Sequence, residues 1–263
     1  MLFLLPPSES KVIGGGSLNI QQVALSFGGL NPARDRVFEA LTALCRNPQN
    51  AARALKLGAK QLELINVNLE AQTAPTLPAL KRYAGTLYEA IDVENLTQQQ
   101  LKVAKETVLI QSALFGLIPA TDLIPNYRLS ASTSLPGLNL KQEWSAAHEP
   151  IWKRLENHAI IDLRSKSYAE LAPIPDTTVH HWVEVVSRES GGSLKALNHF
   201  NKKAKGQLIG AILRSATPVD SIDDLAAIAS SIGMELVANN KNRDLLLVTE
   251  QIPISVGTKK TIG

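Results

Sequence analysis

The sequence predicts an α+β fold in a single domain, with a helix-rich N-terminal half, a mixed β-sheet and a helix-hairpin-helix-like element. Apolar residues repeat at a period near 3.6 through much of residues 21–117, which is typical of amphipathic helices. Short apolar or β-branched runs, typical of strands, precede and follow this region without strict alternation. No Pro/Ser-rich linker divides the chain, so we expect one domain over residues 1–263, with residues 255–263 as a mobile tail.

The composition is that of a globular protein and excludes a disordered chain. Hydrophobic residues make up 44% of the sequence and charged residues 19%. Lysine and arginine number 27 against 24 acidic residues, a net charge of +3, which by itself does not predict nucleic-acid binding. Clustering of basic residues is therefore the relevant signal. Cys45 is the single cysteine, which excludes an intrachain disulfide and favours a reducing compartment.

The first residues predict a buried strand. The run from Leu2 to Leu5 is wholly apolar and is closed by Pro6 and Pro7. It is too short for a membrane span, and no basic residue precedes it as in a secretory leader. We therefore expect a cytoplasmic protein that does not contact the membrane.

Three segments of the N-terminal half predict helices, namely residues 33–45, 50–68 and 97–117. Each repeats apolar residues near the helical period, and prolines separate the segments. We expect the third helix to continue as far as Leu117.

The C-terminal half predicts one interrupted helix and four strands. Residues 141–158 have a helical pattern that Pro150 should interrupt. Residues 159–165 and 179–190 are typical of strands. Residues 234–250 predict two further strands, joined by an asparagine-rich hairpin turn.

A basic helix over residues 199–214 is the first candidate binding element. Its first turns carry lysines and its last turns are apolar all round, so we expect it to emerge from the core. One face of the helical wheel holds Lys195, His199, Lys202, Lys203 and Gly206. With Lys205, this set predicts contacts with DNA phosphates. Gly206 and Gly210 each cost about 1 kcal/mol relative to alanine, so a phosphate backbone or a neighbouring protein helix should approach closely there.

A second basic candidate surrounds Gly58 and Lys60. A helix should end at Leu57, turn through Gly58 and restart at Ala59, which is the outline of a helix-hairpin-helix. The free N–H groups of the second helix would then face a DNA phosphate beside Lys60.

Polar residues after the predicted strands suggest a cleft. The loop after the first strand contains a lysine and three glycines but lacks the order of a P-loop. Ligands often bind at strand ends in mixed α/β sheets. The residues that we expect to line the cleft are Ser8, Lys11, Tyr127, Arg128, Ser165, Lys166 and Tyr168.

No motif for metal binding, cofactor binding or covalent catalysis is present. The five histidines show no H-E-x-x-H spacing, and His180 and His181 would point to opposite faces of a strand. No G-x-S-x-G elbow occurs. We expect no metal and no cofactor, and we assign no catalytic residue, although an enzymatic role stays open.

Five stretches, in their order along the chain, resemble the YaaA family of bacterial peroxide-stress proteins. They are MLFLLPPSESK, RYAGTLYEAID, SALFGLIPATDLIPNYRLS, IIDLRSKSYAEL and FNKKAKG. The resemblance implies a single-domain α+β fold with a helix-hairpin-helix-like element and a positively charged cleft, DNA binding, and a part in limiting free intracellular iron during hydrogen peroxide stress. The family's Lys-Lys-Ala-Arg-Gly pattern falls on residues 202–206, where Lys205 replaces arginine and bidentate phosphate contact is lost. Pro119 stands where many relatives carry an arginine.

Three functional hypotheses follow. The first is weak, sequence-independent and salt-dependent binding of double-stranded DNA by a monomer. The second is an enzyme or small-ligand protein whose basic cleft holds a phosphorylated or nucleotide substrate. In the third, Gly206 and Gly210 pack against another helix and the lysines only keep the protein soluble.

Overall fold

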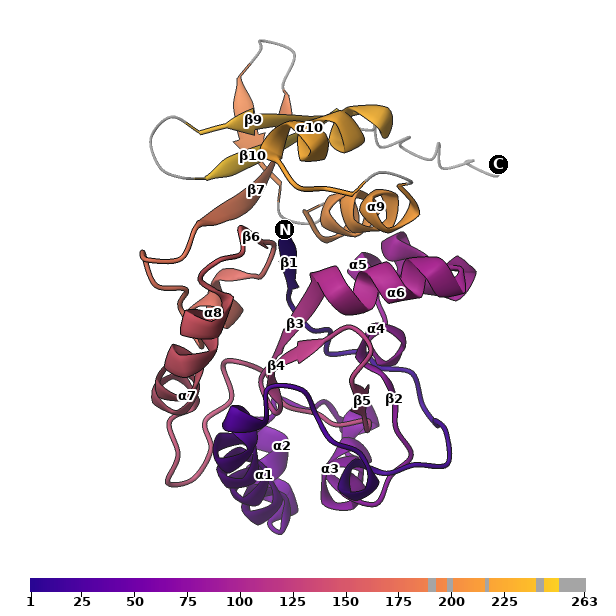
Figure 1. The fold of residues 1–263 in the computed structure, drawn as a ribbon. Helices are drawn as coiled ribbons and strands as arrows, with labels where there is room; N and C mark the ends of the chain where they lie inside the picture. Colours follow the sequence, from indigo (N-terminus) through magenta and orange to yellow (C-terminus); the bar gives the residue numbers. More distant parts are fainter. Residues whose placement is uncertain (189–192, 198–200, 216–217, 240–243, 251–263) are drawn as a thin grey trace, which may run out of the picture.

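The computed structural model describes residues 1–188, 193–197, 201–215, 218–239 and 244–250 (Figure 1). The α-helices are α1 (Asn31–Cys45), α2 (Pro48–Ala54), α3 (Leu64–Glu70), α4 (Ala79–Arg82), α5 (Thr86–Ile91), α6 (Gln98–Thr107), α7 (Leu140–Leu155), α8 (Lys166–Ala169), α9 (Asn201–Arg214) and α10 (Ile222–Ser231). The strands are β1 (Leu2–Leu5), β2 (Leu77–Pro78), β3 (Val108–Ser112), β4 (Gly116–Pro119), β5 (Leu123–Ile124), β6 (Ile160–Asp162), β7 (His180–Arg188), β8 (Leu194–Ala196), β9 (Met234–Ala238) and β10 (Leu245–Glu250). Single 3₁₀ turns are η1 (Ile20–Gln22), η2 (Gly28–Leu30), η3 (Ala59–Gln61) and η4 (Val93–Asn95).

A mixed sheet joins strands from both halves of the chain. Its order is β4-β3-β1-β6-β7-β10-β9, and β8 pairs with β7. The strands β3, β1, β6, β7 and β10 are parallel to their neighbours in this row, whereas β4, β8 and β9 are antiparallel additions. The predicted mixed sheet is therefore confirmed. A separate pair is formed by β2 and β5.

The first strand lies inside the sheet, between β3 and β6, and is buried as its composition predicts. Phe3 pairs with Val108 of β3 on one side and with Ile161 of β6 on the other. All four residues of β1 are buried. Both faces of a parallel strand are covered by other elements, and such strands are apolar throughout.

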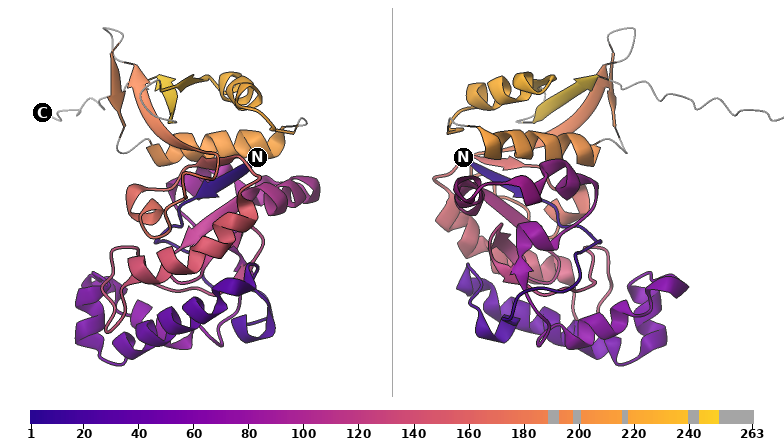
Figure 2. Two further views of the ribbon diagram at one scale, coloured as in Figure 1. Left: turned by 60° about the vertical axis from the view of Figure 1, so that its left-hand side comes forward. Right: turned by 90° about the vertical axis from the view of Figure 1, so that its right-hand side faces the viewer.

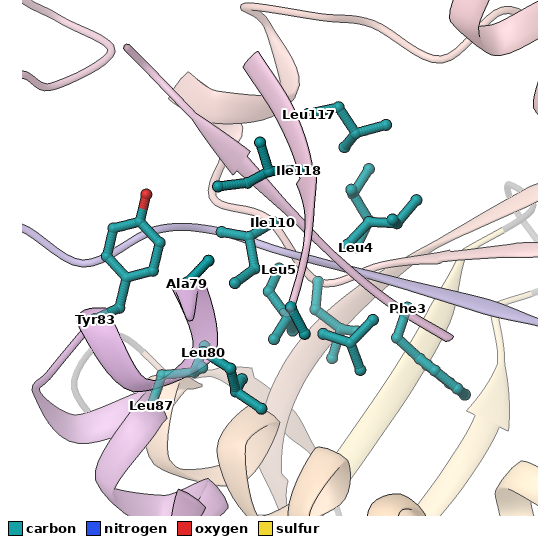
Figure 3. Packing of buried hydrophobic residues seen from close by; sticks show 14 of the residues in the cluster. Phe3, Leu4, Leu5, Ala79, Leu80, Tyr83, Leu87, Ile110, Leu117 and Ile118 are labelled. Carbon is teal, nitrogen blue, oxygen red and sulfur yellow. The ribbon is translucent and has the colours of Figure 1, made fainter. Parts of the chain in front are cut away.

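Side chains of β1, β3 and β4 pack against the short helices α4 and α5 (Figure 3). Ile110 and Ile118 are fully buried there, and Leu80 and Leu87 are less than 5% exposed. Tyr83 belongs to the same packed group and is 2% exposed. The hydrophobic core thus extends directly under the segment that connects α4 and α5.

Helices cover both faces of the sheet. In Figure 1, α5, α6 and α9 lie on one side of the central strands and α7 and α8 on the other, and the two views of Figure 2 agree. The helices α1, α2 and α3 gather at one end of the molecule, whereas α9 and α10 lie at the opposite end.

Helix α9 packs on α5 at very short range. A Cβ atom added to Gly206 would overlap the carbonyl oxygen of Leu87, and it would lie 2.8 Å from the Cβ of Ala90. A Cβ at Gly210 would lie 3.0 Å from the carbonyl oxygen of Ile91. The close approach predicted from the two glycines is therefore made by a neighbouring protein helix.

The strands predicted in the C-terminal half are confirmed. The segment 159–165 forms β6, and the segment 179–190 forms β7 over its described part. The segment 234–250 forms the antiparallel pair of β9 and β10. The turn residues 240–242 and the expected tail lie outside the described residues.

The prediction of one helix over residues 97–117 is wrong. Helix α6 ends at Thr107, and the chain continues as β3 and β4. The five residues of β3 are all buried, and the strand pairs with β1. A short apolar run fits a helix or a strand equally well by periodicity alone, and here the neighbouring strand decides.

Helix α7 runs without interruption through Pro150, contrary to the prediction. Proline removes one main-chain hydrogen bond and crowds the preceding turn. The helix is nevertheless held along its 16 residues by buried side chains that include Trp144, Trp152 and Leu155. Tertiary packing outweighs the local cost.

The expected helix-hairpin-helix is not shown. Helix α2 ends at Ala54, and Lys56 adopts a left-handed conformation with φ of 54°. Gly58 is extended, with φ of −75° and ψ of 167°, and the single turn η3 follows it. Helix α3 begins only at Leu64, so no α-helix restarts at Ala59.

Candidate functional site

The carboxyl ends of the parallel strands β1, β3 and β6 meet at one edge of the sheet. In open α/β sheets this edge is where ligands bind. Polar side chains gather here from five separate parts of the chain. We call them the carboxyl-edge cluster: Ser8, Glu9, Lys11, Tyr83, Ser112, Tyr127, Arg128 and Tyr168.

The loop after β1 is attached to the segment between α4 and α5. The N–H of Ala84 donates to the carbonyl oxygen of Ser10 at 3.0 Å. Lys11 and Tyr83 form an isolated antiparallel bridge. These contacts give the polar loop a defined position although it lies outside the sheet.

Lys11 is half-buried, and its ammonium group lies between main-chain oxygens and an aromatic ring. Nζ donates to the carbonyl oxygens of Ser8 at 3.0 Å and Glu9 at 3.4 Å. The same atom lies 4.0 Å from the ring centroid of Tyr127, which is a favourable cation–π distance. Burial, followed by the charge of Arg128, lowers the pKa of Lys11 to about 7. Lys11 therefore changes its charge near neutral pH.

A chain of hydroxyl groups lies beneath Lys11. The hydroxyl of Tyr127 lies 2.8 Å from that of Tyr83 and 2.8 Å from Oγ of Ser112. Oγ of Ser112 also accepts from the N–H groups of Leu114 and Phe115. Burial raises the pKa of both tyrosines, so they stay neutral and act as hydrogen-bonding groups.

Arg128 is a nearly buried cation, and the side-chain amide of buried Asn68 hydrogen bonds to both of its main-chain groups. Its N–H donates to Oδ1 of Asn68 at 2.7 Å, and Nδ2 of Asn68 donates to its carbonyl oxygen at 2.9 Å. The guanidinium group contacts Oε2 of Glu9 at 2.7 Å. The Arg128 side chain is 10% exposed and that of Glu9 is 61% exposed.

A buried ion pair lies at the end of β6, next to the cluster. Nε and Nη2 of Arg164 donate to the carboxylate of Asp162, with Nη2 at 2.7 Å from Oδ2. Nη1 of Arg164 donates to the carbonyl oxygen of Ala172 at 2.9 Å. Neither charged side chain is more than 4% exposed. This pair joins β6 to the segment that follows α8.

Of the predicted cleft-lining residues, the structure brings five together: Ser8, Lys11, Tyr127, Arg128 and Tyr168. Tyr168 is half-buried, and burial is the main cause that raises its pKa. The charges of Glu9 and Arg128 also act on that pKa, so Tyr168 lies near both. Ser165 and Lys166 are exposed at the start of α8.

Lys205 points into the protein rather than to the surface. Its residue is 4% exposed, and Nζ donates to the carbonyl oxygen of Leu163 at 3.0 Å. Nζ also lies 5.4 Å from the ring centroid of Trp182. Burial lowers the pKa of Lys205 to about 8, while Asp162 acts in the opposite direction.

Replacing Lys205 by methionine is expected to reduce the rise of stability with pH between about 8 and the ordinary lysine value of 10.5. In this window the folded protein has released the proton of Lys205 and the unfolded chain still holds it. Stability rises with pH wherever the unfolded state binds more protons, and the Lys205→Met variant lacks this contribution. Urea unfolding at a series of pH values measures the difference, with the exposed Lys202→Met as the control. Equal slopes for wild type and Lys205→Met would contradict the expectation.

The predicted DNA-binding residues near α9 fall in different environments. Lys202 and Lys203 are exposed in the first turn of α9. Lys195 is exposed but lies on β8, not on the face of a helix as we expected. Gly206 is buried against α5, and His199 lies outside the described residues.

Gly58 and Lys60 are exposed in the turn that contains η3. This turn lies with α2 and α3 at the end of the molecule opposite α9 (Figure 1). The two basic candidates predicted from sequence therefore do not meet in one site.

Four residues of this region were not predicted as site residues: Glu9, Tyr83, Ser112 and Asp162. In the sequence, Glu9 lies between the predicted residues Ser8 and Lys11, and its negative charge suits it to pair with Arg128. Tyr83 belongs to the stretch RYAG, but only the fold brings it to Tyr127. Asp162 carries the clearest signal, since a charge inside an apolar strand needs a partner.

The described part of the chain can be searched for two kinds of feature, namely groups of metal ligands and membrane-spanning helices. Within it, no group of three or more His, Cys, Asp or Glu side chains could hold a metal ion. None of its helices has both the length and the apolar character needed to cross a membrane.

Comparison with known proteins gives extensive matches. A family model described as "Peroxide stress protein YaaA" matches residues 1–236. A UPF0246 protein of Corynebacterium glutamicum is 35% identical over 251 residues, which cover 94% of this chain and 98% of that protein. A UPF0246 protein of Streptomyces coelicolor is 33% identical over 241 residues, covering 90% and 92%. A UPF0246 protein of Streptococcus uberis is 26% identical over 210 residues, covering 78% and 85%.

Proposed function

We propose, because this chain belongs to the YaaA family of peroxide stress proteins, that it binds double-stranded DNA without sequence preference and helps to limit free intracellular iron under hydrogen peroxide stress. The protein acts in the cytoplasm, and exposed lysine side chains contact the DNA phosphates. DNA binding and iron limitation are separate parts of the proposal and are tested separately.

The first turn of α9 supports DNA binding best. Lys202 and Lys203 are both exposed there, and the turn contains no acidic residue. The N-terminus of a helix carries a partial positive charge, so two lysines at this end are unfavourable unless an anion lies close. Neither lysine forms an ion pair with a carboxylate in the described part of the chain. A DNA phosphate would supply the negative charge.

Lys60 and Lys205 have different parts in this proposal. Lys60 is a separate contact, since η3 and α9 lie at opposite ends of the molecule (Figure 1). The buried ammonium group of Lys205 hydrogen bonds to Leu163 and does not touch the duplex directly. The primary contact is therefore made by Lys202 and Lys203.

The double variant Lys202→Gln/Lys203→Gln is expected to reduce the salt dependence of duplex binding. Each phosphate contact contributes about 0.9 to the slope of log K against log salt concentration, so the slope should fall by about 1.8. Fluorescence anisotropy of a labelled duplex, titrated between about 50 and 200 mM salt, measures this slope.

A matched control distinguishes the loss of a phosphate contact from the loss of net positive charge. Lys141 and Lys153 are exposed on α7, and the variant Lys141→Gln/Lys153→Gln also removes two positive charges, but at a different place. The salt dependence of duplex binding by this variant should equal that of the wild type. If both double variants change the slope equally, the assignment to α9 is wrong. The single variant Lys60→Gln tests the second contact, with an expected decrease of about 0.9.

The iron part of the proposal is tested in cells. A strain that lacks the protein should show more chelatable iron during peroxide exposure than one that carries it, as measured by electron paramagnetic resonance after chelation. The same strain is complemented with Lys202→Gln/Lys203→Gln. If this variant lowers the iron level as well as the wild type does, iron limitation does not depend on the contact with DNA.

A further inference from the structure

The ion pair of Glu9 and Arg128 joins two groups that differ in how firmly they are held. The guanidinium side chain is 10% exposed and the carboxylate side chain 61% exposed, with 2.7 Å between Nη1 and Oε2. Both main-chain groups of Arg128 are fixed by Asn68, which is itself fully buried. The cation is therefore the fixed member of the pair. The carboxylate is the exposed member, and ion pairs with exposed groups contribute little to stability.

The charges around this pair do not balance. Lys11, when protonated, and Arg128 are both cations, and both contact Glu9: Nζ of Lys11 donates to its carbonyl oxygen at 3.4 Å, and the guanidinium of Arg128 pairs with its carboxylate at 2.7 Å. The charge of Arg128 also lowers the pKa of Lys11. Glu9 is the single carboxylate that acts on Lys11 in the described part of the chain. Arg82, the third cation near Lys11, is fully buried and donates to the carbonyl oxygens of Ile124, Val12 and Pro75. Each of its three side-chain nitrogens thus already donates to a main-chain oxygen, so Lys11 and Arg128 are the cations better placed to bind an added anion.

We propose that Arg128 and Lys11 bind the phosphoryl group of a small phosphate monoester, and that the carboxylate of Glu9 occupies this position until the ligand displaces it. A carboxylate balances one of the two cations. A phosphate monoester near neutral pH carries close to two negative charges and balances both.

The surroundings offer further donors to the phosphate oxygens. Ser8 is half-buried on the same loop, and its Oγ lies 3.2 Å from where a Cβ of Gly85 would be. Tyr168 is half-buried and lies near enough to Glu9 and Arg128 for both to affect its pKa. The position is the carboxyl edge of the parallel strands, which is the usual place for ligands in such sheets.

The test is calorimetric titration of the full chain with phenyl phosphate at about pH 6.5, which lies above the second pKa of a phosphate monoester, about 6, and below the pKa of Lys11, about 7. The Glu9→Gln variant should bind phenyl phosphate about fivefold more tightly than the wild type, because the competing carboxylate is gone; an exposed ion pair sets this scale. The control is Glu235→Gln, which removes the equally short but distant pair with Arg188 at 2.6 Å. Its affinity should equal that of the wild type.

The variant Arg128→Lys keeps the charge but loses the fork of donors, and it should bind phenyl phosphate at least about tenfold more weakly. Its melting temperature without ligand shows whether it is folded. If Arg128→Lys is not folded, the proposal is decided by comparing the affinity of Glu9→Gln for phenyl phosphate with that of the wild type and of Glu235→Gln. Unchanged or weaker binding by Glu9→Gln, or binding of phenyl phosphate to neither protein, overturns the proposal.

A pH series with sulfate, which stays a dianion, tests the part of Lys11. The groups that face its ammonium are Glu9, Arg82, Arg128, Tyr83 and Tyr127. Affinity should fall as the pH rises through about 7 in the wild type and should stay constant in Lys11→Arg. A fall of equal size in both proteins removes Lys11 from the site and overturns the proposal.

A duplex DNA arm distinguishes a small ligand from the DNA backbone. Glu9→Gln should leave the affinity for a short duplex unchanged. If it strengthens duplex binding and not the binding of phenyl phosphate, the site serves a phosphodiester and the small-ligand proposal is wrong. This result is independent of the α9 variants, so failure of one proposal does not decide the other.

Discussion

Replacing Asp162 by asparagine is expected to lower the free energy of unfolding by about 3 kcal/mol or more. The change keeps the shape of the side chain but leaves the guanidinium group of Arg164, whose side chain is 1% exposed, without its counter-charge. Nε and Nη2 of Arg164 both donate to the carboxylate. A buried charge that loses its partner keeps the full cost of its removal from water. Urea unfolding followed by tryptophan fluorescence measures the loss.

Two further variants define what this result means. Glu235→Gln breaks the pair of Arg188 and Glu235, which is as short at 2.6 Å but about half exposed on both sides, and should cost less than about 1 kcal/mol. The double variant Asp162→Leu/Arg164→Met removes both buried charges and should be more stable than Asp162→Asn. An Asp162→Asn protein as stable as Glu235→Gln would show that the buried pair is not a determinant of stability.

Replacing Gly206 by alanine is expected to destabilise the protein by about 2 kcal/mol. The added Cβ would overlap the carbonyl oxygen of Leu87, and main-chain atoms cannot move aside as the end of a flexible side chain can. Overpacking of this kind costs about 3 kcal/mol, and the better helix propensity of alanine returns about 1 kcal/mol. Thermal and urea unfolding measure the net effect.

Gly58→Ala is the matched control for this substitution. Gly58 has φ of −75°, which any residue adopts, and a Cβ there would come no closer than 3.8 Å to another atom. Its stability should change by less than about 0.5 kcal/mol. If Gly206→Ala is as stable as Gly58→Ala, the two helices tolerate a wider separation and the glycine is not required by packing.

Much of the sheet could be predicted from local sequence. The apolar run closed by Pro6 and Pro7 predicted β1, and β-branched residues predicted β7. The asparagine-rich segment predicted the pairing of β9 with β10. A strand buried on both faces must be apolar along its whole length, so the residues of the strand itself are enough to predict it.

Other elements depended on contacts that local sequence does not contain. The segment that forms β3 fitted a helix as well as a strand, and pairing with β1 decided between them. Pro150 should have interrupted α7, yet the buried face of this helix holds it together. Around Gly58 the glycine suggested a helix-hairpin-helix, but the chain there forms a single 3₁₀ turn.

The candidate site was likewise predicted only in part from the sequence. Sequence pattern named Ser8, Lys11, Tyr127 and Arg128 as polar residues near strand ends, and the structure brings them together. The sequence pattern could not show that Glu9, in the loop after β1, pairs with Arg128. The pattern of α9 also suggested that its lysines act as one set, whereas the structure separates exposed Lys202 and Lys203 from buried Lys205.

The sequence by itself determined which segments enter the core and which family the chain resembles, because apolar periodicity and motif order are properties of the chain as written. Only the tertiary structure decided what each polar group touches. Nζ of Lys205 hydrogen bonds to a residue 42 positions away, and the guanidinium of Arg128 pairs with the loop after β1. Burial and charge act through space, so the pKa of a lysine and the strength of an ion pair depend on neighbours that the linear sequence does not place.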